Sequence, residues 1–172
     1  MTIELPKLSI AVALLALPFS ASAGWEIGAE SVTPTGDFSD IAGGGGGLYV
    51  QHVSTMNENV LLTGYLGALA YGGIDIFGVE VQWYGYPLTT GMVYYPNGVE
   101  EGGPFVKANA GTLFKLSTVT YLGDEESESE TGFVLSPGVG WDFGSVNVTA
   151  DYNIGNDSWT WISVKAAFRF GM

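Results

Sequence analysis

The sequence predicts an all-β chain that folds as an eight-stranded antiparallel up-and-down transmembrane β-barrel. The main observation is that apolar and polar residues alternate with a period of two along most of the chain, the pattern of strands with one apolar and one polar face. A second is that the few cations lie on the polar faces. A third is the composition, with 26 glycines, 13% aromatic and only 13% charged residues. Such a composition suits a glycine-rich β architecture and not disorder, which requires low hydrophobicity.

Residues 1–23 have the layout of a cleaved signal peptide, which leaves residues 24–172 as one barrel domain. Lys7 precedes the apolar run Leu8–Phe19, and Ala21-Ser22-Ala23 has the A-x-A form of a cleavage site. The alternative is an N-terminal membrane anchor, but the run is shorter than the ~20 residues of a spanning helix. No other apolar run approaches that length, so a mature chain that lies in a membrane must form a closed barrel.

Short alternating runs, separated by Gly, Pro, Asn and Asp, follow one another after Gly24 and predict eight strands. The predicted strands are Trp25–Thr33, Gly46–Val53, Val60–Tyr71, Val79–Tyr95, Phe105–Tyr121, Thr131–Trp141, Val146–Ile154 and Trp159–Phe170. We expect a break or bulge at Pro87, because proline cannot donate to a central ladder.

Two unusual segments lie between the predicted strands. The five glycines Gly43–Gly47 indicate either a flexible loop or a close backbone approach, and they lack the GxGxxG spacing of a nucleotide site. The acidic run Asp124–Glu130 is predicted to be a solvated loop. A calcium site is the alternative there, but the run lacks the glycine and the ligand register of an EF-hand.

The positions of the cations indicate which face of the sheet is the interior. After Lys7, the remaining cations are Lys107, Lys115, Lys165 and Arg169, and all four lie on the polar face of a strand. A cation facing lipid at the bilayer midplane would cost ~2–4 kcal/mol. We therefore predict that they form a charge network in the lumen. The carboxylates Asp142 and Asp151 lie on the polar faces of the neighbouring strands and complete that network. The alternative is a soluble sandwich with a charged outer face.

Aromatic residues cluster near the predicted strand ends, where membrane barrels carry interfacial girdles. The residues expected to belong to these girdles are Tyr94, Tyr95, Trp141, Tyr152, Trp159, Trp161, Phe168 and Phe170. Eight strands leave an interior that is just filled by side chains or holds one small ligand, so a wide aqueous pore is not expected.

Several stretches together resemble the small outer-membrane β-barrel proteins of the OmpX/OmpW-like kind. They are Pro34–Asp40, Asn57–Tyr65, Leu88–Tyr95, Gly103–Gly111, Gly138–Trp141 and Trp161–Phe170. The resemblance covers essentially the mature chain. It implies a location in the outer membrane, contact with membrane lipids and lipopolysaccharide, insertion by the barrel assembly machinery through the last strand, and a periplasmic N-terminus. Gly171-Met172 after Phe170 depart from the terminal aromatic of that insertion signal.

Candidate chemistry is sparse. A net charge of −13 makes the chain a poor nucleic-acid binder. The absence of cysteine excludes disulfides, and a single histidine leaves no support for a metal or another cofactor. His52 and Ser54 could serve a lipid A-modifying enzyme, but we expect no catalytic role at the periplasmic end of a strand. The expected function is a monomeric, structural or surface barrel with a filled lumen. The alternative is a narrow channel or binding barrel for a small apolar molecule.

Overall fold

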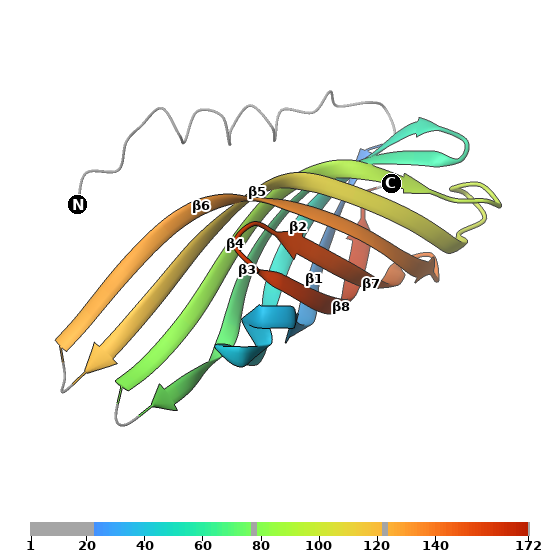
Figure 1. The fold of residues 1–172 in the computed structure, drawn as a ribbon. Coiled ribbons are helices and arrows are strands. Elements are labelled where there is room, and N and C mark those ends of the chain that lie inside the picture. The colour runs from blue at the N-terminus through green and yellow to red at the C-terminus, as the bar shows by residue number, and fades with distance from the viewer. Residues whose placement is uncertain (1–22, 77–78, 122–123, 172) are drawn as a thin grey trace.

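The computed structural model describes residues 23–76, 79–121 and 124–171. Eight strands form one closed barrel in which each strand is antiparallel to its neighbours (Figure 1). Consecutive strands are joined by short connections, and β1 and β8 close the ring through the register Trp25↔Phe170 to Thr35↔Thr160. The fold predicted from the alternation, an eight-stranded antiparallel barrel, is therefore confirmed.

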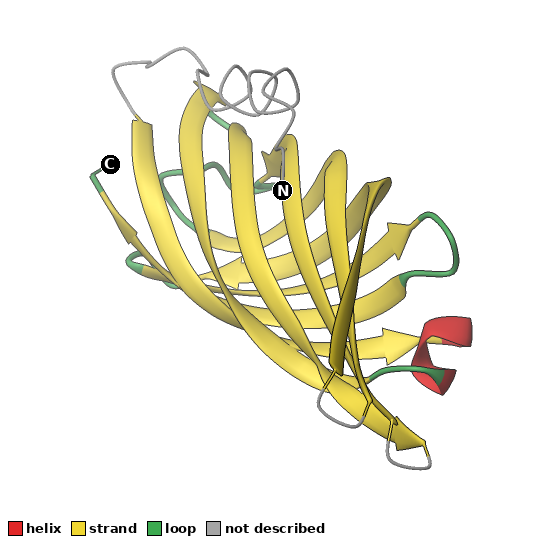
Figure 2. Ribbon diagram, turned by 90° about the vertical axis from the view of Figure 1, so that its left-hand side faces the viewer, coloured by secondary structure: helices red, strands yellow, loops and turns green. Residues whose placement is uncertain are grey.

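The strands differ in length, and this difference shapes one end of the molecule. Their bounds are β1 Ala23–Thr35, β2 Gly43–Asn57, β3 Val60–Ile76, β4 Val79–Tyr94, β5 Gly103–Tyr121, β6 Asp124–Asp142, β7 Val146–Gly155 and β8 Thr160–Phe170. The 3-10 helix η1, Gly36–Asp40, joins β1 to β2 (Figure 2). Within the described residues, no helix is long and apolar enough to span a bilayer.

The predicted acidic loop is wrong, because residues 124–130 belong to β6. They pair with β5 from Lys115↔Glu130 to Tyr121↔Asp124. Pairing of β6 with β7 ends at Val134↔Gly155, and pairing of β2 with β3 ends at Gly43↔Gly72. The outer parts of β3, β4, β5 and β6 therefore continue beyond the closed barrel as a four-stranded extension, here called the projecting sheet (Figure 1). Carboxylates do not prevent a strand when their side chains reach water.

The five-glycine run also lies in a strand, at the start of β2. A Cβ atom built on Gly45 would lie 1.9 Å from the carbonyl oxygen of Ala70, and one on Gly47 would lie 2.3 Å from that of Ala68. A side chain at either position would require the backbone to move. Of the two alternatives that the sequence left open, the structure shows the close backbone approach.

Proline interrupts the hydrogen-bonded ladder at two positions without breaking a strand. β4 remains paired with β5 at Pro87↔Leu113, whereas its ladder to β3 passes from Leu66↔Leu88 to Leu69↔Gly85. Pro137 does the same on β6, where the ladder to β7 passes from Leu135↔Ile154 to Gly138↔Asp151. The interruption expected at Pro87 is thus confirmed on one side of the strand.

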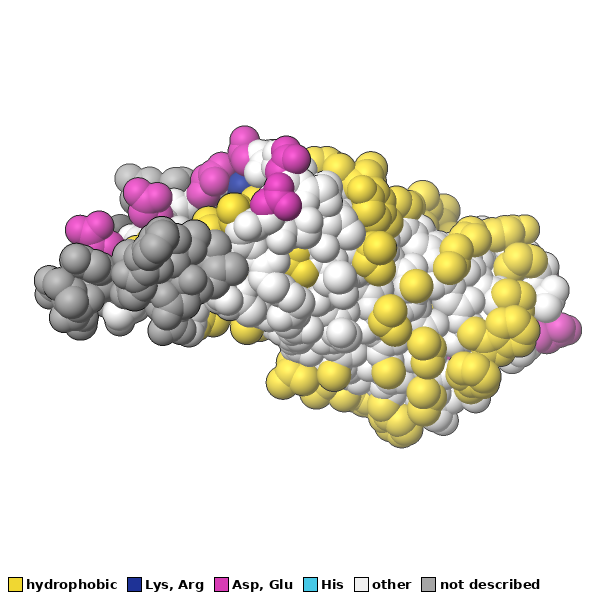
Figure 3. All heavy atoms as spheres, turned by 60° about the horizontal axis from the view of Figure 1, so that its bottom comes forward, with side chains coloured by type: hydrophobic (Ala, Val, Ile, Leu, Met, Phe, Trp, Pro, Cys, Tyr) yellow, Lys and Arg dark blue, Asp and Glu magenta, His cyan; other side chains and the backbone are white. Residues whose placement is uncertain are grey.

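The period of two separates the wall from the interior. Along β7 the burial alternates strictly, with Asn147, Thr149, Asp151 and Asn153 buried and the residues between them exposed. One row of the outer wall runs Val106, Val139, Ala150, Val164 across four adjacent strands. Exposed apolar side chains are spread over this wall (Figure 3). Buried polar residues line the inside. An apolar belt around a polar interior is the pattern of a membrane barrel.

Candidate functional site

The interior of the barrel is organised in layers along its axis. The end at which β1 begins and β8 ends is here called the terminal end, and the opposite one the far end. Apart from Lys115, the buried charged residues lie between the terminal end and a group of aromatic residues that closes the interior toward the far end. From the terminal end outward, the interior holds two charged clusters and then an aromatic plug.

Arg169 of β8 is the centre of the first layer, the terminal cluster, which comprises Glu26, Tyr95, Asp142 and Arg169. The Arg169 guanidinium lies 2.7 Å from Glu26 Oε1 and 2.6 Å from Asp142 Oδ2. It also donates a hydrogen bond to the Tyr95 hydroxyl at 3.2 Å, and that hydroxyl donates to Asp142 at 3.0 Å. Two carboxylates from β1 and β6 thus hold one guanidinium, whose planar fork suits such pairing.

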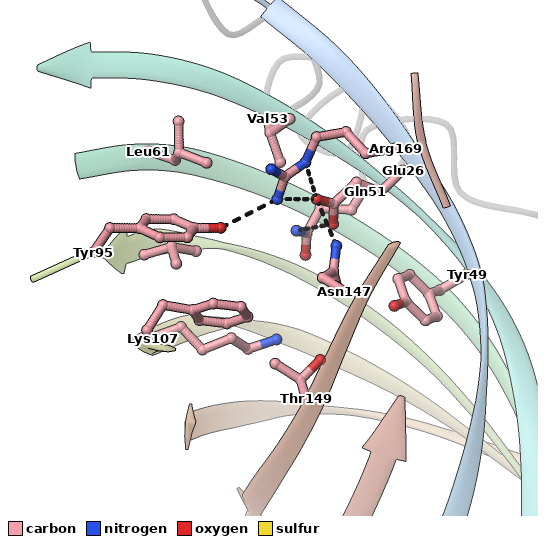
Figure 4. A pocket seen from close by; sticks show the side chains of 12 residues that line it. Glu26, Tyr49, Gln51, Val53, Leu61, Tyr95, Lys107, Asn147, Thr149 and Arg169 are labelled. Atoms are coloured by element: carbon pink, nitrogen blue, oxygen red, sulfur yellow. Dashed lines mark hydrogen bonds and ion pairs between the residues drawn. The ribbon is translucent and has the colours of Figure 1, made fainter. Parts of the chain in front are cut away.

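Neutral side chains complete the bonding of Glu26. The Gln51 amide donates to Glu26 Oε2 at 2.9 Å, and the Asn147 amide donates to Glu26 Oε1 at 2.9 Å (Figure 4). The cavity beside this cluster has a volume of only about 10 Å³. That is room for about one water molecule.

Asp151 joins two lysines in the second layer, the middle cluster, which comprises Glu30, Lys107, Asp151 and Lys165. Asp151 Oδ2 lies 3.0 Å from Lys107 Nζ and 3.3 Å from Lys165 Nζ, and Lys165 also lies 3.3 Å from Glu30. All four are buried. Removing one member of such a buried network costs far more than removing an exposed pair, because its partner remains desolvated.

Two tyrosines enclose the middle cluster. The Tyr65 hydroxyl donates to Glu30, and the Lys165 ammonium lies 4.1 Å from the centre of the Tyr65 ring and 5.4 Å from that of Tyr49. A cation over an aromatic face is stabilised by the ring quadrupole. The second cavity, beside Lys165 and Asp151, again measures only about 10 Å³.

An aromatic plug closes the far end of the interior, and it comprises Phe38, Tyr71, Trp83, Trp159 and Trp161. Phe38 reaches inward from η1, is 1% exposed and stacks on Trp159 with ring centres 4.5 Å apart. The Trp83 indole N–H donates to the carbonyl oxygen of Ile41 at 3.1 Å, and Ser158 donates to Asp37 at 3.2 Å. These bonds tie the β1–β2 connection to the projecting sheet and to the β7–β8 turn.

Lys115 lies beyond the plug and belongs to neither interior cluster. Its ammonium lies 3.2 Å from Glu130 and 3.2 Å from Asp157, and 5.4 Å from the centre of the Trp159 ring. Both carboxylates are exposed to water. The hydrogen bond from Lys115 lowers the pKa of Asp157 from its ordinary value.

The six residues predicted for a lumen network therefore divide among three places. Lys107, Lys165 and Asp151 meet in the middle cluster, Arg169 and Asp142 meet in the terminal cluster, and Lys115 lies at the far rim. The prediction missed Glu26 and Glu30, which supply half of the interior carboxylates. The alternation of Glu26 and Glu30 with Trp25, Ile27 and Ala29 was the signal that could have placed them inside.

The predicted aromatic girdle is partly wrong. Tyr94, Trp141, Tyr152, Phe168 and Phe170 are exposed on the wall, as a girdle requires. In contrast, Tyr95, Trp159 and Trp161 are at most 5% exposed and pack inside the barrel. Trp161 has the same parity as Lys165 along β8, which places both on the inner face.

His52 lies on the outer face of β2, between Gln51 and Val53, whose side chains point inward. Its ring meets Trp25 edge-on, with centres 4.9 Å apart. Ser54 has the same parity and hence the same face. The interior carboxylates lie on the other face of the sheet, so they cannot orient His52 as in a catalytic triad. Among the described residues, no group of three His, Asp or Glu side chains is arranged to hold a metal.

Comparison with solved structures places this fold among outer-membrane barrels. The attachment invasion locus protein Ail of Yersinia pestis matches 86% of this chain and 97% of its own, with 16% identity and a TM-score of 0.67. Its complex with the heparin analogue sucrose octasulfate covers the same shares, with 18% identity and a TM-score of 0.62. Neisserial surface protein A matches 87% of this chain and 97% of its own, with 12% identity and a TM-score of 0.55.

No protein-family model and no curated protein matches the chain. At identities of 12–18% the likeness to the solved structures shows the fold, and the fold is that of an integral outer-membrane β-barrel.

Proposed function

We propose that this protein is an integral outer-membrane barrel with a sealed interior, and that it has a structural and surface role in the cell envelope. The sealed interior is the observation that carries the proposal. Two buried charge clusters and the aromatic plug fill the described interior, and the cavities beside the two clusters measure about 10 Å³ each. An eight-stranded barrel is at the size where side chains alone can fill the lumen.

The orientation follows from the resemblance to outer-membrane barrels, with the terminal end in the periplasm and the far end outside. The apolar wall then contacts membrane lipids and the lipid part of lipopolysaccharide. The mature protein is a monomer that begins at Gly24, and its last strand serves the barrel assembly machinery during insertion. The signal peptide predicted for residues 1–23 lies outside the described residues except for Ala23, the first residue of β1.

Electrical recording in planar bilayers tests the sealed interior. We expect purified, refolded protein to give no discrete openings above the baseline, because both clusters and the plug obstruct the axis. An eight-stranded barrel with a genuinely open lumen, measured in the same bilayers, is the control. Regular unitary steps that scale with salt concentration would show that the interior conducts and would overturn the proposal.

A binding barrel for a small apolar molecule is the second candidate, and the proline interruptions favour it. At Pro87 the ladder between β3 and β4 lacks two consecutive pairs, and at Pro137 the ladder between β6 and β7 lacks two as well. A lateral opening at either position would lead to the wall and bypass the plug. Discrete conductance is not expected from such a path, so uptake of an apolar solute by protein-containing liposomes would distinguish it from the sealed barrel.

A catalytic role is not part of the proposal. The placement of His52 on the wall, across the sheet from the interior carboxylates, supports its absence. We also do not propose that this chain binds a polyanion such as sucrose octasulfate, the heparin analogue seen with Ail. The exposed outer strand β6 carries Glu126, Glu128 and Glu130, and carboxylates repel sulfate groups.

A further inference from the structure

The projecting sheet has an open edge along β6. Residues 126–131 of β6 pair with β5 on one side, from Phe114↔Thr131 to Val119↔Glu126. On the other side the pairing with β7 ends at Val134↔Gly155, and β7 itself ends at Gly155 (Figure 1). A strand edge of this length offers a row of backbone donors and acceptors to another extended chain.

The hydrogen bond just beyond the last pair fixes which backbone groups face that edge. Asn156 N–H donates to the carbonyl oxygen of Phe133 at 3.2 Å, so the backbone groups of Phe133 point toward the β7 side. Backbone groups of an antiparallel strand alternate between its two neighbours. The N–H and C=O groups of Ser127, Ser129 and Thr131 therefore point to the open edge.

The same stretch presents its carboxylates on one face. Glu126, Glu128 and Glu130 alternate with those three residues and are all exposed. They are spaced by an even number of residues from the buried Val134 and Ser136, so their side chains lie on the same, inward-facing side of the sheet. Acidic side chains gather at this end of the molecule (Figure 3). The row Trp83, Ser117, Glu128 runs across three adjacent strands on this concave face. It lines an open cleft of about 610 Å³, together with Lys115, Ser129, Glu130, Asp157 and Trp159.

We propose that the β6 edge from Ser127 to Thr131 binds an extended cationic segment of another protein, which adds to the projecting sheet as a fifth strand. The added strand bonds through its backbone to Ser127, Ser129 and Thr131. Its side chains alternate between two faces, so every second one lies beside Glu126, Glu128 and Glu130. The favoured partner carries Lys or Arg at every second position, because opposite charges on neighbouring strands stabilise a sheet.

Charge also argues against a second copy of this chain as the occupant. Two β6 edges paired with each other would bring their glutamates together across the new ladder, and like charges directly opposite are destabilising. The outward position of the sheet rests on the proposed function, whereas the edge, the alternation and the acidic face are properties of the fold itself.

Peptides of equal composition test the proposal on the full barrel in nanodiscs. The probe is a fluorescent peptide with the repeat Lys-Thr over eight residues, compared with its block isomer of four Lys followed by four Thr. We expect fluorescence anisotropy at 150 mM salt to show the alternating peptide binding about tenfold more tightly, a difference of about 1.4 kcal/mol. Equal affinities would reduce the interaction to net charge and overturn the proposal, as would the absence of binding.

Two variants separate the backbone from the side chains. Ser129→Pro removes one N–H from the open edge and none from the β5 ladder, and Glu126→Gln/Glu128→Gln removes two charges but leaves the Lys115 partner Glu130 in place. Each should weaken the alternating peptide about tenfold. Glu100→Gln/Glu101→Gln in the β4–β5 turn at the terminal end is the matched control and should leave the affinity unchanged.

The outcomes discriminate this inference from the proposed function. Unchanged affinity in Ser129→Pro, with the variant still folded by its shift on an unheated gel, would refute strand addition. Cross-linked dimers of the barrel would make a second copy the occupant and refute the cationic partner. If the protein conducts ions and also binds the peptide, only the sealed interior is refuted. If it shows no conductance and does not bind the peptide, only the strand addition at β6 is refuted.

Discussion

At the scale of single residues, Arg169 is the cation that holds the two carboxylates of the terminal cluster together. It is the one group between Glu26 and Asp142, both buried, and it also bonds to Tyr95. Arg169→Met should lower the free energy of unfolding by about 3–5 kcal/mol, because two carboxylates would remain desolvated without a cation. Urea unfolding in lipid vesicles, followed by tryptophan fluorescence, measures this change.

Lys115→Met is the matched comparison at the residue scale. It deletes the same charge from a residue with two carboxylate partners, but Glu130 and Asp157 are exposed and regain water. We expect a much smaller loss than for Arg169→Met. If both variants lost the same stability, burial of the partners would not be the reason for the strength of the terminal cluster.

At the scale of elements, η1 acts as the outer closure of the barrel through one side chain. Phe38 inserts between Trp159, Tyr71 and Trp83, so Phe38→Ala should cost about 3–5 kcal/mol, as other buried aromatic truncations do. The variant should still give no conductance, because both charge clusters lie beneath the plug. Planar-bilayer recording checks this. If Phe38→Ala gave unitary openings and the unchanged protein gave none, η1 would be the barrier to ion flow and the charge clusters would not.

The elements also show how far the sequence was informative. Alternation correctly assigned the faces of β5 to β8, because a polar side chain in the wrong place would meet lipid. Alternation could not predict where β6 ends on its outer side. Beyond the membrane both faces of a strand meet water, and glutamate is tolerated there in a strand as well as in a loop. Tyr95, Trp159 and Trp161 were misplaced because large aromatics stabilise both an interface and an interior. The interior position can be recognised only from the alternation. Trp159 and Trp161 are an even number of residues from the inward-facing Lys165, and Tyr95 is two residues from the inward-facing Val93.

At the scale of the whole molecule, closure makes the barrel cooperative. Every strand has two hydrogen-bonded neighbours, and β1 and β8 pair along the full length of β8. Such a ring cannot lose one strand without exposing two edges to lipid. We therefore expect a heat-modifiable protein that migrates faster on an SDS gel before boiling than after it, and that fractionates with outer membranes. A soluble periplasmic form with one mobility would contradict the membrane barrel.

The projecting sheet carries its carboxylates well above the rim of the closed barrel. β6 continues from Phe133 to Asp124 beyond its last pair with β7. At about 3.3 Å per residue this is roughly 33 Å along the strand, or about 23 Å above the rim for a tilt near 45°. The Debye length in physiological salt is about 8 Å. Glu126, eight residues beyond Val134, lies about 19 Å above the rim on the same reckoning, roughly two screening lengths away, so its charge is screened from groups at the rim and can attract cationic molecules in solution.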